Sequence, residues 1–189
     1  MNPPRGQSDL QTQHIGELMP GFRLPLLDGG GERSLDDFLK DHKGTLFVFW
    51  SGSCAHCLRY DAFFNSFTDC YPQLGFAAIA SRINETREQM ISAARDRRLS
   101  FPILRDEGAR IARLWFSQQT PRCYLVDHGG RLIYRGAIDN FKLPEDPGHL
   151  EYLKPAIAQF LNGEPVARAD TPSFGCAIET VYYQLPKQL

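Results

Sequence analysis

Residues 45–60 read TLFVFWSGSCAHCLRY, an apolar run followed by two cysteines that stand close together. The run 45–50 is continuous and rich in β-favouring residues, which predicts a strand covered on both of its faces. Beyond the cysteines, apolar side chains recur at helical spacing over residues 58–71. The stretch therefore predicts a strand, a short turn that carries Cys54 and Cys57, and a helix.

Outward from this stretch, strand and helix patterns alternate along the chain. The expected elements are a short hairpin around glycines 29–31, a helix after the N-cap Ser34, strands at 75–81 and 101–107, helices within 86–98 and 109–116, a hairpin over 123–139, and a last helix that ends at Asn162-Gly163. Pro155 either kinks this last helix or marks its start near Lys154. The order predicts an α/β fold in three α/β/α layers, with a mixed central sheet and an N-terminal hairpin.

The chain of 189 residues is long enough for one domain with a real core. We expect an N-terminal arm over residues 1–20, rich in Gln, Pro and Gly and loosely draped. The domain itself is expected over 21–163, and residues 164–189 are expected to form a tail that packs on it.

The amino-acid composition limits the kinds of partner that the protein is expected to bind. The chain is 42% hydrophobic and 23% charged, and its net charge of −1 gives no reason to expect nucleic acid as a partner. Arg95, Arg97 and Arg98 are interpreted as a solvated helix face, and Asp61 and Asp139 as solvated carboxylates. No apolar stretch is long enough for a membrane span.

The first twenty residues hold no hydrophobic segment of the kind found in secretory signals. We therefore expect a cytoplasmic protein, or a periplasmic one if a leader precedes this chain.

The spacing of the two cysteines carries the chemistry. Cys54 should lie near the helix N-cap and Cys57 one turn later, about 60° away around the axis, which permits a disulfide. Unpaired N–H groups and the helix dipole in the first turn favour a thiolate. We expect Cys54, nearer the end and less covered, to attack, and Cys57 to resolve the mixed disulfide.

His56 stands between the two cysteines. An imidazole there can stabilise the Cys54 thiolate and make the disulfide more oxidising. The alternative is a solvent-exposed loop histidine with little influence.

The segments FVFWSGSCAHC and TPRCYLVDHGGRLIYRGAID, with FRLPLLDGGGERSLDDF before them, resemble the thioredoxin-fold redoxin group that includes TlpA/ResA-like oxidoreductases and AhpC/TSA peroxiredoxins. The resemblance covers about residues 20–163. It implies a thioredoxin-like fold, a thiol–disulfide oxidoreductase that needs no external cofactor, and a redox partner protein. It also implies that Thr120-Pro121 carries a cis-proline that packs against the cysteine pair, with the adjacent backbone pairing with a substrate strand.

The tail NGEPVARADTPSFGCAIE is similar to a C-terminal segment of a peroxiredoxin-like subgroup, and it singles out Cys176. Two interpretations stay open. Cys176 is either a third redox cysteine that exchanges with the pair, or a structural cysteine packed under a returning tail.

A thiol peroxidase is the main alternative, with Cys54 peroxidatic and Cys57 or Cys176 resolving. Ser51 favours it, because peroxiredoxins place a hydroxyl residue there. Pro121 argues against it, because it fills the position where that group carries an arginine, and Arg122 should project to the other face of the strand.

A zinc site is a weaker alternative, because Cys70 should point away from the Cys54, His56 and Cys57 group. No metal is therefore expected. Cys123 is expected to be buried as a small hydrophobe. Trp50 is expected to shape the rim of the redox site, although most such residues belong to a core.

Overall fold

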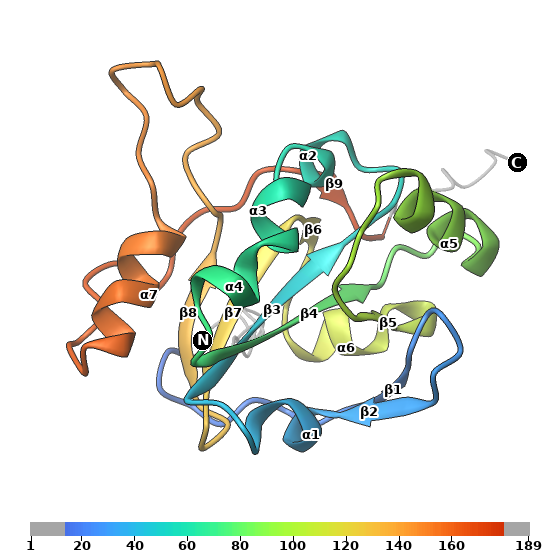
Figure 1. Ribbon diagram of the computed structural model, residues 1–189, viewed down its shortest axis with the longest axis horizontal. Helices are drawn as coiled ribbons and strands as arrows, with labels where there is room; N and C mark the ends of the chain where they lie inside the picture. The colour runs from blue at the N-terminus through green and yellow to red at the C-terminus, as the bar shows by residue number, and fades with distance from the viewer. Residues whose placement is uncertain (1–13, 180–189) are drawn as a thin grey trace, which may run out of the picture.

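The computed structural model describes residues 14–179, which fold around a five-stranded sheet in the order β5-β4-β3-β7-β8 (Figure 1). Its strands are β3 (Gly44–Trp50), β4 (Leu74–Ala80), β5 (Ile103–Arg105), β7 (Arg122–Asp127) and β8 (Leu132–Gly136). β3, β4 and β5 run parallel, whereas β7 is antiparallel to both of its neighbours. The predicted mixed sheet and its C-terminal hairpin are therefore confirmed.

Helices and short strands surround this sheet. The helices are α1 (Leu35–Leu39), α2 (Ala55–Leu58), α3 (Asp61–Asn65), α4 (Phe67–Cys70), α5 (Arg87–Asp96), α6 (Arg110–Leu114) and α7 (Leu153–Leu161), with a 3₁₀ turn at Glu107–Ala109. Two small antiparallel sheets pair β1 (Arg23–Pro25) with β2 (Glu32–Ser34), and β6 (Gln119–Thr120) with β9 (Cys176–Ala177). The pairing of β6 with β9 is absent from the sequence prediction.

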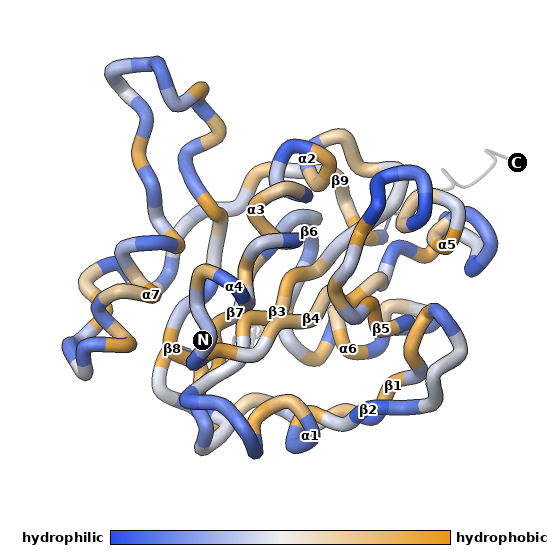
Figure 2. The backbone as a smooth tube through the Cα atoms, viewed as in Figure 1, coloured by the Kyte–Doolittle hydropathy of each residue, from blue (hydrophilic) through white to orange (hydrophobic). Residues whose placement is uncertain are grey.

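Side chains of β3 alternate between two cores. Leu46, Val48 and Trp50 pack with residues of α3, α5 and α7, whereas Phe47 and Phe49 pack with residues of α1 and α6. All five are fully buried. The central strands accordingly form an apolar interior that is surrounded by polar loops (Figure 2). The predicted three layers are confirmed.

Two helix ends follow from local chemistry. Ser34 caps α1 as predicted, because its Oγ accepts a hydrogen bond from Asp37 N–H at 3.2 Å and the Asp37 carboxylate accepts one from Ser34 N–H at 2.9 Å. Pro155 lies in the first turn of α7, which begins at Leu153, where a missing N–H costs no intrahelical hydrogen bond. The helix therefore starts just before Pro155.

The single helix predicted over residues 58–71 is wrong, because the chain forms α2, α3 and α4 with breaks at Tyr60 and Ser66. At Tyr60 the backbone leaves the helical region as the side chain turns toward Asp139. The Ser66 hydroxyl donates to the Ala62 carbonyl at 3.1 Å, so the carbonyls at the end of α3 keep a partner. Helical spacing of apolar residues survives both breaks.

Both edges of the central sheet are covered by other parts of the chain. At the β5 edge, Leu26 forms an antiparallel bridge with Leu104, and Leu27 N–H donates to the Ile103 carbonyl at 2.8 Å. At the β8 edge, Thr171 N–H donates to the Arg135 carbonyl at 2.9 Å. Segments from the two ends of the chain therefore lie along the two outer strands.

The expected N-terminal arm is in part docked. Gly16 N–H donates to the Leu132 carbonyl at 2.7 Å and Met19 N–H to the Gly130 carbonyl at 2.8 Å, and Met19 is buried. Residues 1–13, which make up the remainder of that arm, lie outside the described residues, as do residues 180–189 of the tail. Among the described helices, none combines the length and apolar character needed to cross a membrane.

Candidate active site

The two cysteines lie at the start of α2, just after the turn that follows β3. Cys54 is the N-cap of α2, and its carbonyl accepts from Cys57 N–H at 3.0 Å and from Leu58 N–H at 3.3 Å. This is the predicted placement, with Cys57 in the first turn. The helix is only four residues long, so its dipole contributes less than a long helix would supply.

The turn before Cys54 is held by two charged side chains from across the fold. The Glu85 carboxylate accepts hydrogen bonds from the backbone N–H groups of Gly52, at 3.2 Å, and Ser53. The Arg97 guanidinium donates to the carbonyls of Ser51, at 3.4 Å, and Gly52, at 3.0 Å. N–H groups and carbonyls of the turn therefore both have charged partners, which fixes the position from which α2 starts.

Arg97 is not part of a solvated face as predicted, and Asp61 is not a solvated carboxylate. The Arg97 guanidinium makes two hydrogen bonds of 2.6 Å to the Asp61 carboxylate, and the two side chains are only 11% and 10% exposed. The guanidinium also lies over the Trp50 ring, 5.1 Å from its centroid. Arg95 and Arg98 do lie on the surface.

Both cysteines of the pair are buried, which corrects the expectation that Cys54 is the less covered one. Cys54 is 1% exposed and Cys57 is 0% exposed. Cys57 packs within the core, whereas Cys54 also meets the C-terminal strap, residues 171–179, which runs beside α2 (Figure 1) and brings Cys176 Sγ within 4.8 Å of Cys54 Sγ. Its strand β9 pairs antiparallel with β6, so that Cys176 stands opposite Thr120.

The Thr120–Pro121 peptide bond is cis. In its protonated form the Cys54 thiol donates to the Thr120 carbonyl at 3.1 Å, and the Thr120 hydroxyl donates to the Cys176 carbonyl at 3.4 Å. Thr120 therefore contacts both the cysteine pair and the strap. The predicted role of this dipeptide in holding a substrate strand stays a prediction.

Cys176 and His56 complete the cluster around Cys54. The Sγ atoms of Cys54 and Cys176 and a ring nitrogen of His56 all lie within 4.8 Å of one another. His56 Nδ1 is 3.8 Å from Cys176 Sγ, and its ring packs against Phe141 with centroids 4.7 Å apart. The His56 side chain thus contacts both Cys176 and Phe141.

The three thiols differ in acidity. Hydrogen bonding from the Cys57 thiol, with smaller contributions from Cys176 and Thr120, holds the pKa of Cys54 well below its ordinary value, although burial opposes this shift. Burial, reinforced by the neighbouring Cys54 sulfur, raises the pKa of Cys57, and the same causes raise the pKa of Cys176. Cys54 is therefore the thiolate of the cluster, and two protonated thiols face it.

A second buried network lies next to the cluster. The Tyr60 hydroxyl donates to the Asp139 carboxylate at 2.6 Å, and Phe141 N–H donates to the same carboxylate at 2.6 Å. Asp139 is buried, so its predicted solvation is wrong. Burial first, and then the Asp139 charge, raise the pKa of the Tyr60 hydroxyl. Arg59 donates to the Phe141 carbonyl at 2.9 Å and lies over the Phe141 ring.

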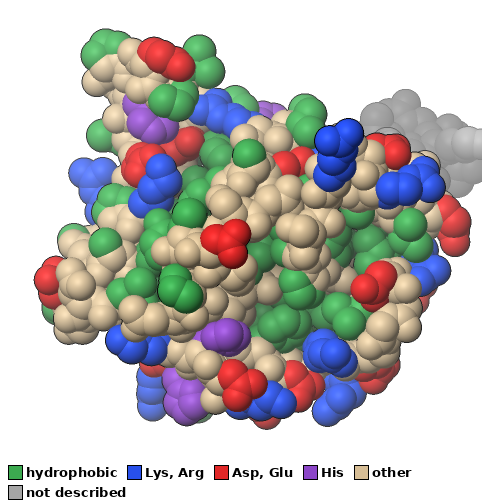
Figure 3. Space-filling model, in the orientation of Figure 1, with side chains coloured by type: hydrophobic (Ala, Val, Ile, Leu, Met, Phe, Trp, Pro, Cys, Tyr) green, Lys and Arg blue, Asp and Glu red, His purple; other side chains and the backbone are tan. Residues whose placement is uncertain are grey.

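This network anchors the base of the loop between β8 and α7, which stands out from the body of the protein (Figure 1). Figure 3 shows hydrophobic side chains on this protruding loop. In the segment between β8 and α7, Phe141, Leu143 and Leu150 are exposed.

The remaining predicted residues fall in different places. Ser51 is buried, with its Oγ 3.4 Å from Ser53 Oγ. Trp50 is fully buried in the same core as the cysteines, so it supports the site from beneath and does not form a rim. Arg122 lies over the Tyr124 ring in the other core, as predicted for its strand position.

The other two cysteines are remote from the chemistry. Cys123 is buried as predicted, and burial raises its pKa, whereas Cys70 is exposed at the end of α4. The only group in the described residues with spacing suited to a metal ion is Cys54, His56 and Cys176, not the set with Cys70. It offers three ligands, whereas a closed structural zinc site uses four.

Reasoning from the sequence missed the Glu85 and Arg97 clamp, and it could not choose between the two interpretations of Cys176. The Gly-Cys pair at residues 175–176 was the available signal for the strap. A methyl group on Gly175 would come within 1.9 Å of the Thr120 carbonyl oxygen, so the close approach of the strap requires glycine there.

A protein-family model, the AhpC/TSA family, matches residues 15–135. Among curated proteins, the thiol-disulfide oxidoreductase ResA of Geobacillus thermodenitrificans (strain NG80-2) is 27% identical over 143 residues, covering 75% of this chain and 79% of its own length. ResA of Bacillus anthracis is 26% identical over 128 residues, covering 67% of this chain and 71% of its own.

Solved structures agree on the fold. The hypothetical protein SMc02350 from Sinorhizobium meliloti 1021 superposes with a TM-score of 0.76 at 26% identity, covering 89% of this chain and 95% of its own. The thioredoxin domain of the thiol-disulfide oxidoreductase BVU-2223 from Bacteroides vulgatus gives 0.57 at 16% identity, over 66% and 89%. Peroxidoxin BcpB from Mycobacterium tuberculosis gives 0.57 at 16%, over 65% and 84%. The predicted thioredoxin-like fold is confirmed.

Proposed function

The chain belongs to the AhpC/TSA family, and from that premise we propose that it is a thiol–disulfide oxidoreductase in which Cys54 and Cys57 exchange electrons with a partner protein. The observation that carries the proposal is the asymmetry of the pair. The Cys54 thiolate is favoured at the N-cap of α2, while Cys57 is held as a thiol one turn later.

When a partner disulfide reaches Cys54 directly, the exchange takes two steps. The Cys54 thiolate attacks one sulfur of a partner disulfide, and the other partner sulfur leaves as a thiolate. Cys57 then gives its proton to that thiolate and attacks Cys54 Sγ, which releases the second partner sulfur. The products are a Cys54–Cys57 disulfide and a reduced partner, and the same steps in reverse oxidise a partner dithiol.

Each step uses a different acidity. A low pKa makes Cys54 a good leaving group, whereas a raised pKa delays the attack of Cys57 until a partner is bound. Hydrogen bonds to the Cys54 thiolate stabilise the reduced form, which favours the oxidising direction.

A thiol peroxidase would use the same Cys54 thiolate, so the residues around Cys54 must distinguish peroxide reduction from disulfide exchange. Pro121 occupies the position at which the sequence resemblance expects an arginine, and Arg122 lies in the opposite core, where it donates to the Phe116 carbonyl at 3.5 Å. The Arg97 guanidinium is engaged by Asp61 and the turn carbonyls. This arrangement favours disulfide exchange over peroxide reduction.

The test compares reduction of insulin disulfides with consumption of hydrogen peroxide. With dithiothreitol as the electron donor, wild type should accelerate insulin reduction whichever direction its potential favours. The acceleration should fall about a thousandfold or more in Cys54→Ser, because removal of an attacking group costs at least this factor. Cys70→Ser, which changes an exposed cysteine, is the matched control and should equal wild type.

Full activity of Cys54→Ser would overturn the proposal. Peroxide consumption much faster than insulin reduction would replace it with the peroxidase function.

A further inference from the structure

The cysteine that a partner can reach is Cys176. Cys54 and Cys57 are 1% and 0% exposed, whereas Cys176 is only half-buried and its Sγ lies within 4.8 Å of Cys54 Sγ. Disulfide exchange requires an attacking sulfur to approach the sulfur–sulfur bond directly, so access decides which cysteine reacts. With the strap in place, a protein partner meets Cys176 first.

We propose that Cys176 is a third redox residue, which exchanges disulfides with the partner on one side and with Cys54 on the other. This inference rests on the proposed function, because it assigns the route by which the Cys54–Cys57 pair exchanges electrons. The cluster is then a relay of three thiols, with Cys54 at its centre.

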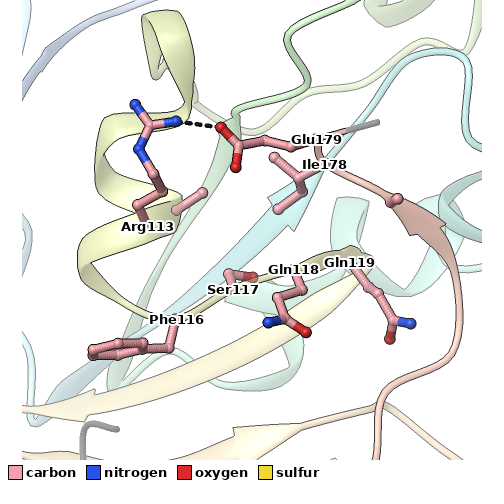
Figure 4. A pocket seen from close by; sticks show the side chains of 9 residues that line it. Arg113, Phe116, Ser117, Gln118, Gln119, Ile178 and Glu179 are labelled. Atoms are coloured by element: carbon pink, nitrogen blue, oxygen red, sulfur yellow. Dashed lines mark hydrogen bonds and ion pairs between the residues drawn. The ribbon is translucent and has the colours of Figure 1, made fainter. Parts of the chain in front are cut away.

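The strap holds Cys176 in position from both sides. After Cys176, the buried Ile178 donates its N–H to the Gln118 carbonyl at 2.9 Å, and Glu179 forms an ion pair with Arg113, seen in Figure 4. Before Cys176, the Thr171 hydroxyl lies 2.9 Å from the Tyr134 hydroxyl and accepts from Ala137 N–H at 3.1 Å. Contacts at both ends therefore make Cys176 a resident member of the site.

A pocket of about 470 Å³ opens beside the far end of the strap, between α6 and the residues that follow β9. The side chains of Gln118, Gln119 and Ile178 point toward it in Figure 4, and none of the three cysteines lines it. Ala177 of the strap thus lines this pocket, whereas the preceding residue, Cys176, has its Sγ near Cys54.

The groups around Cys176 suit a sulfur that changes its protonation. Burial and the Cys54 sulfur raise the pKa of Cys176, and the Arg82 charge and the Ala55 N–H offset part of that shift. His56 Nδ1 lies 3.8 Å from the Cys176 sulfur, where it can accept the thiol proton. His56 is therefore a positioning and proton-accepting residue for Cys176.

The relay needs no reagent other than the partner disulfide. Cys176 gives its proton to His56, attacks one partner sulfur and releases the other as a thiolate. The Cys54 thiolate attacks Cys176 Sγ and releases the second partner sulfur, which leaves a Cys54–Cys176 disulfide. Cys57 passes its proton to a released partner thiolate and attacks Cys54 Sγ. The Cys176 thiolate leaves and takes back the proton from His56.

Two variants distinguish the relay from a strap that only covers the site. The relay predicts slower insulin reduction in both variants, whereas a mere cover predicts an unchanged or a faster rate. Cys176→Ser removes the thiol, and Gly175→Ala shifts it, because an added methyl would meet the Thr120 carbonyl oxygen at 1.9 Å. We expect both to slow insulin reduction by at least about tenfold, because a thiol held beside Cys54 acts at a high effective concentration. Gly21→Ala, where nothing lies within 4 Å of the added methyl, is the control.

Unchanged or faster insulin reduction in Cys176→Ser would overturn the relay and show that partners reach Cys54 directly. Cys54→Ser separates this failure from failure of the proposed function, because a retained activity there would overturn both.

A chemical readout is independent of turnover. Cys57→Ser treated with oxidised glutathione should form a disulfide that links the tryptic peptides 44–59 and 169–187, which carry Cys54 and Cys176. In the double variant with Cys176→Ser, a glutathione adduct should remain instead. Persistence of that adduct in Cys57→Ser itself would contradict the proposal.

Discussion

Replacing Arg97 with alanine should lower the free energy of unfolding by about 3–5 kcal/mol, the cost of leaving one charge of a buried pair without its partner. Asp61 would keep a carboxylate that is only 10% exposed and would lose two hydrogen bonds of 2.6 Å. The carbonyls of Ser51 and Gly52 would lose their donor as well. Urea denaturation of the reduced protein measures the change.

The matched control is Arg95→Ala in the last turn of α5, the helix that Arg97 caps. The Arg95 side chain is 74% exposed, and the change should be within about 0.5 kcal/mol. Equal effects of the two variants would show that the Arg97–Asp61 pair adds nothing. Asp61→Asn combined with Arg97→Ala completes a double-mutant cycle, and the two changes should couple strongly because the residues are in direct contact.

The reduced protein should become more stable as the pH rises from 5 to 7, by up to about 2.7 kcal/mol relative to Cys54→Ser, since one proton of difference gives about 1.36 kcal/mol per pH unit. In the folded state the pKa of Cys54 is depressed, so the thiolate is present, whereas the unfolded chain holds that proton up to pH 9.0. The stabilisation is therefore lost as the pH falls toward the folded pKa. Cys57, whose pKa is raised, stays neutral in both states and contributes nothing in this range.

Urea denaturation at the two pH values, with thiolate absorbance near pH 5 as a second readout, checks this expectation. Cys70→Ser should follow wild type, because its thiol is exposed. The oxidised protein should lose the difference from Cys54→Ser, because a disulfide has no ionisable thiol. Identical pH dependence in reduced wild type and Cys54→Ser would contradict the thiolate assignment.

Local patterns in the sequence were sufficient to predict the layered fold. Residues 46–50 are all apolar, so a strand there must be buried on both faces, and its side chains do alternate between two cores. Ser34 with Asp37 forms a capping box within four residues. The placement of Cys54 at a helix start followed from the same kind of short-range information.

Contacts between distant residues account for what was missed. Asp61 and Arg97 carry charges that are typical of a surface, and their burial depends on a pairing across 36 positions of the chain. The strands β6 and β9 are two residues long, too short for a periodic pattern, and they meet only after the tail returns. The breaks at Tyr60 and Ser66 coincide with side-chain hydrogen bonds, and they leave the spacing of apolar residues unchanged.

The bridges at Leu26 and Asp170 have a consequence for self-association. An uncovered outer strand offers a row of unpaired N–H and carbonyl groups to any neighbouring chain, which leads to aggregation or strand exchange. Here Leu27 N–H donates to the Ile103 carbonyl, Thr171 N–H donates to the Arg135 carbonyl, and Arg135 N–H donates to the Ala169 carbonyl. The two flanking segments thus prevent a strand of another chain from pairing with either edge of the central sheet.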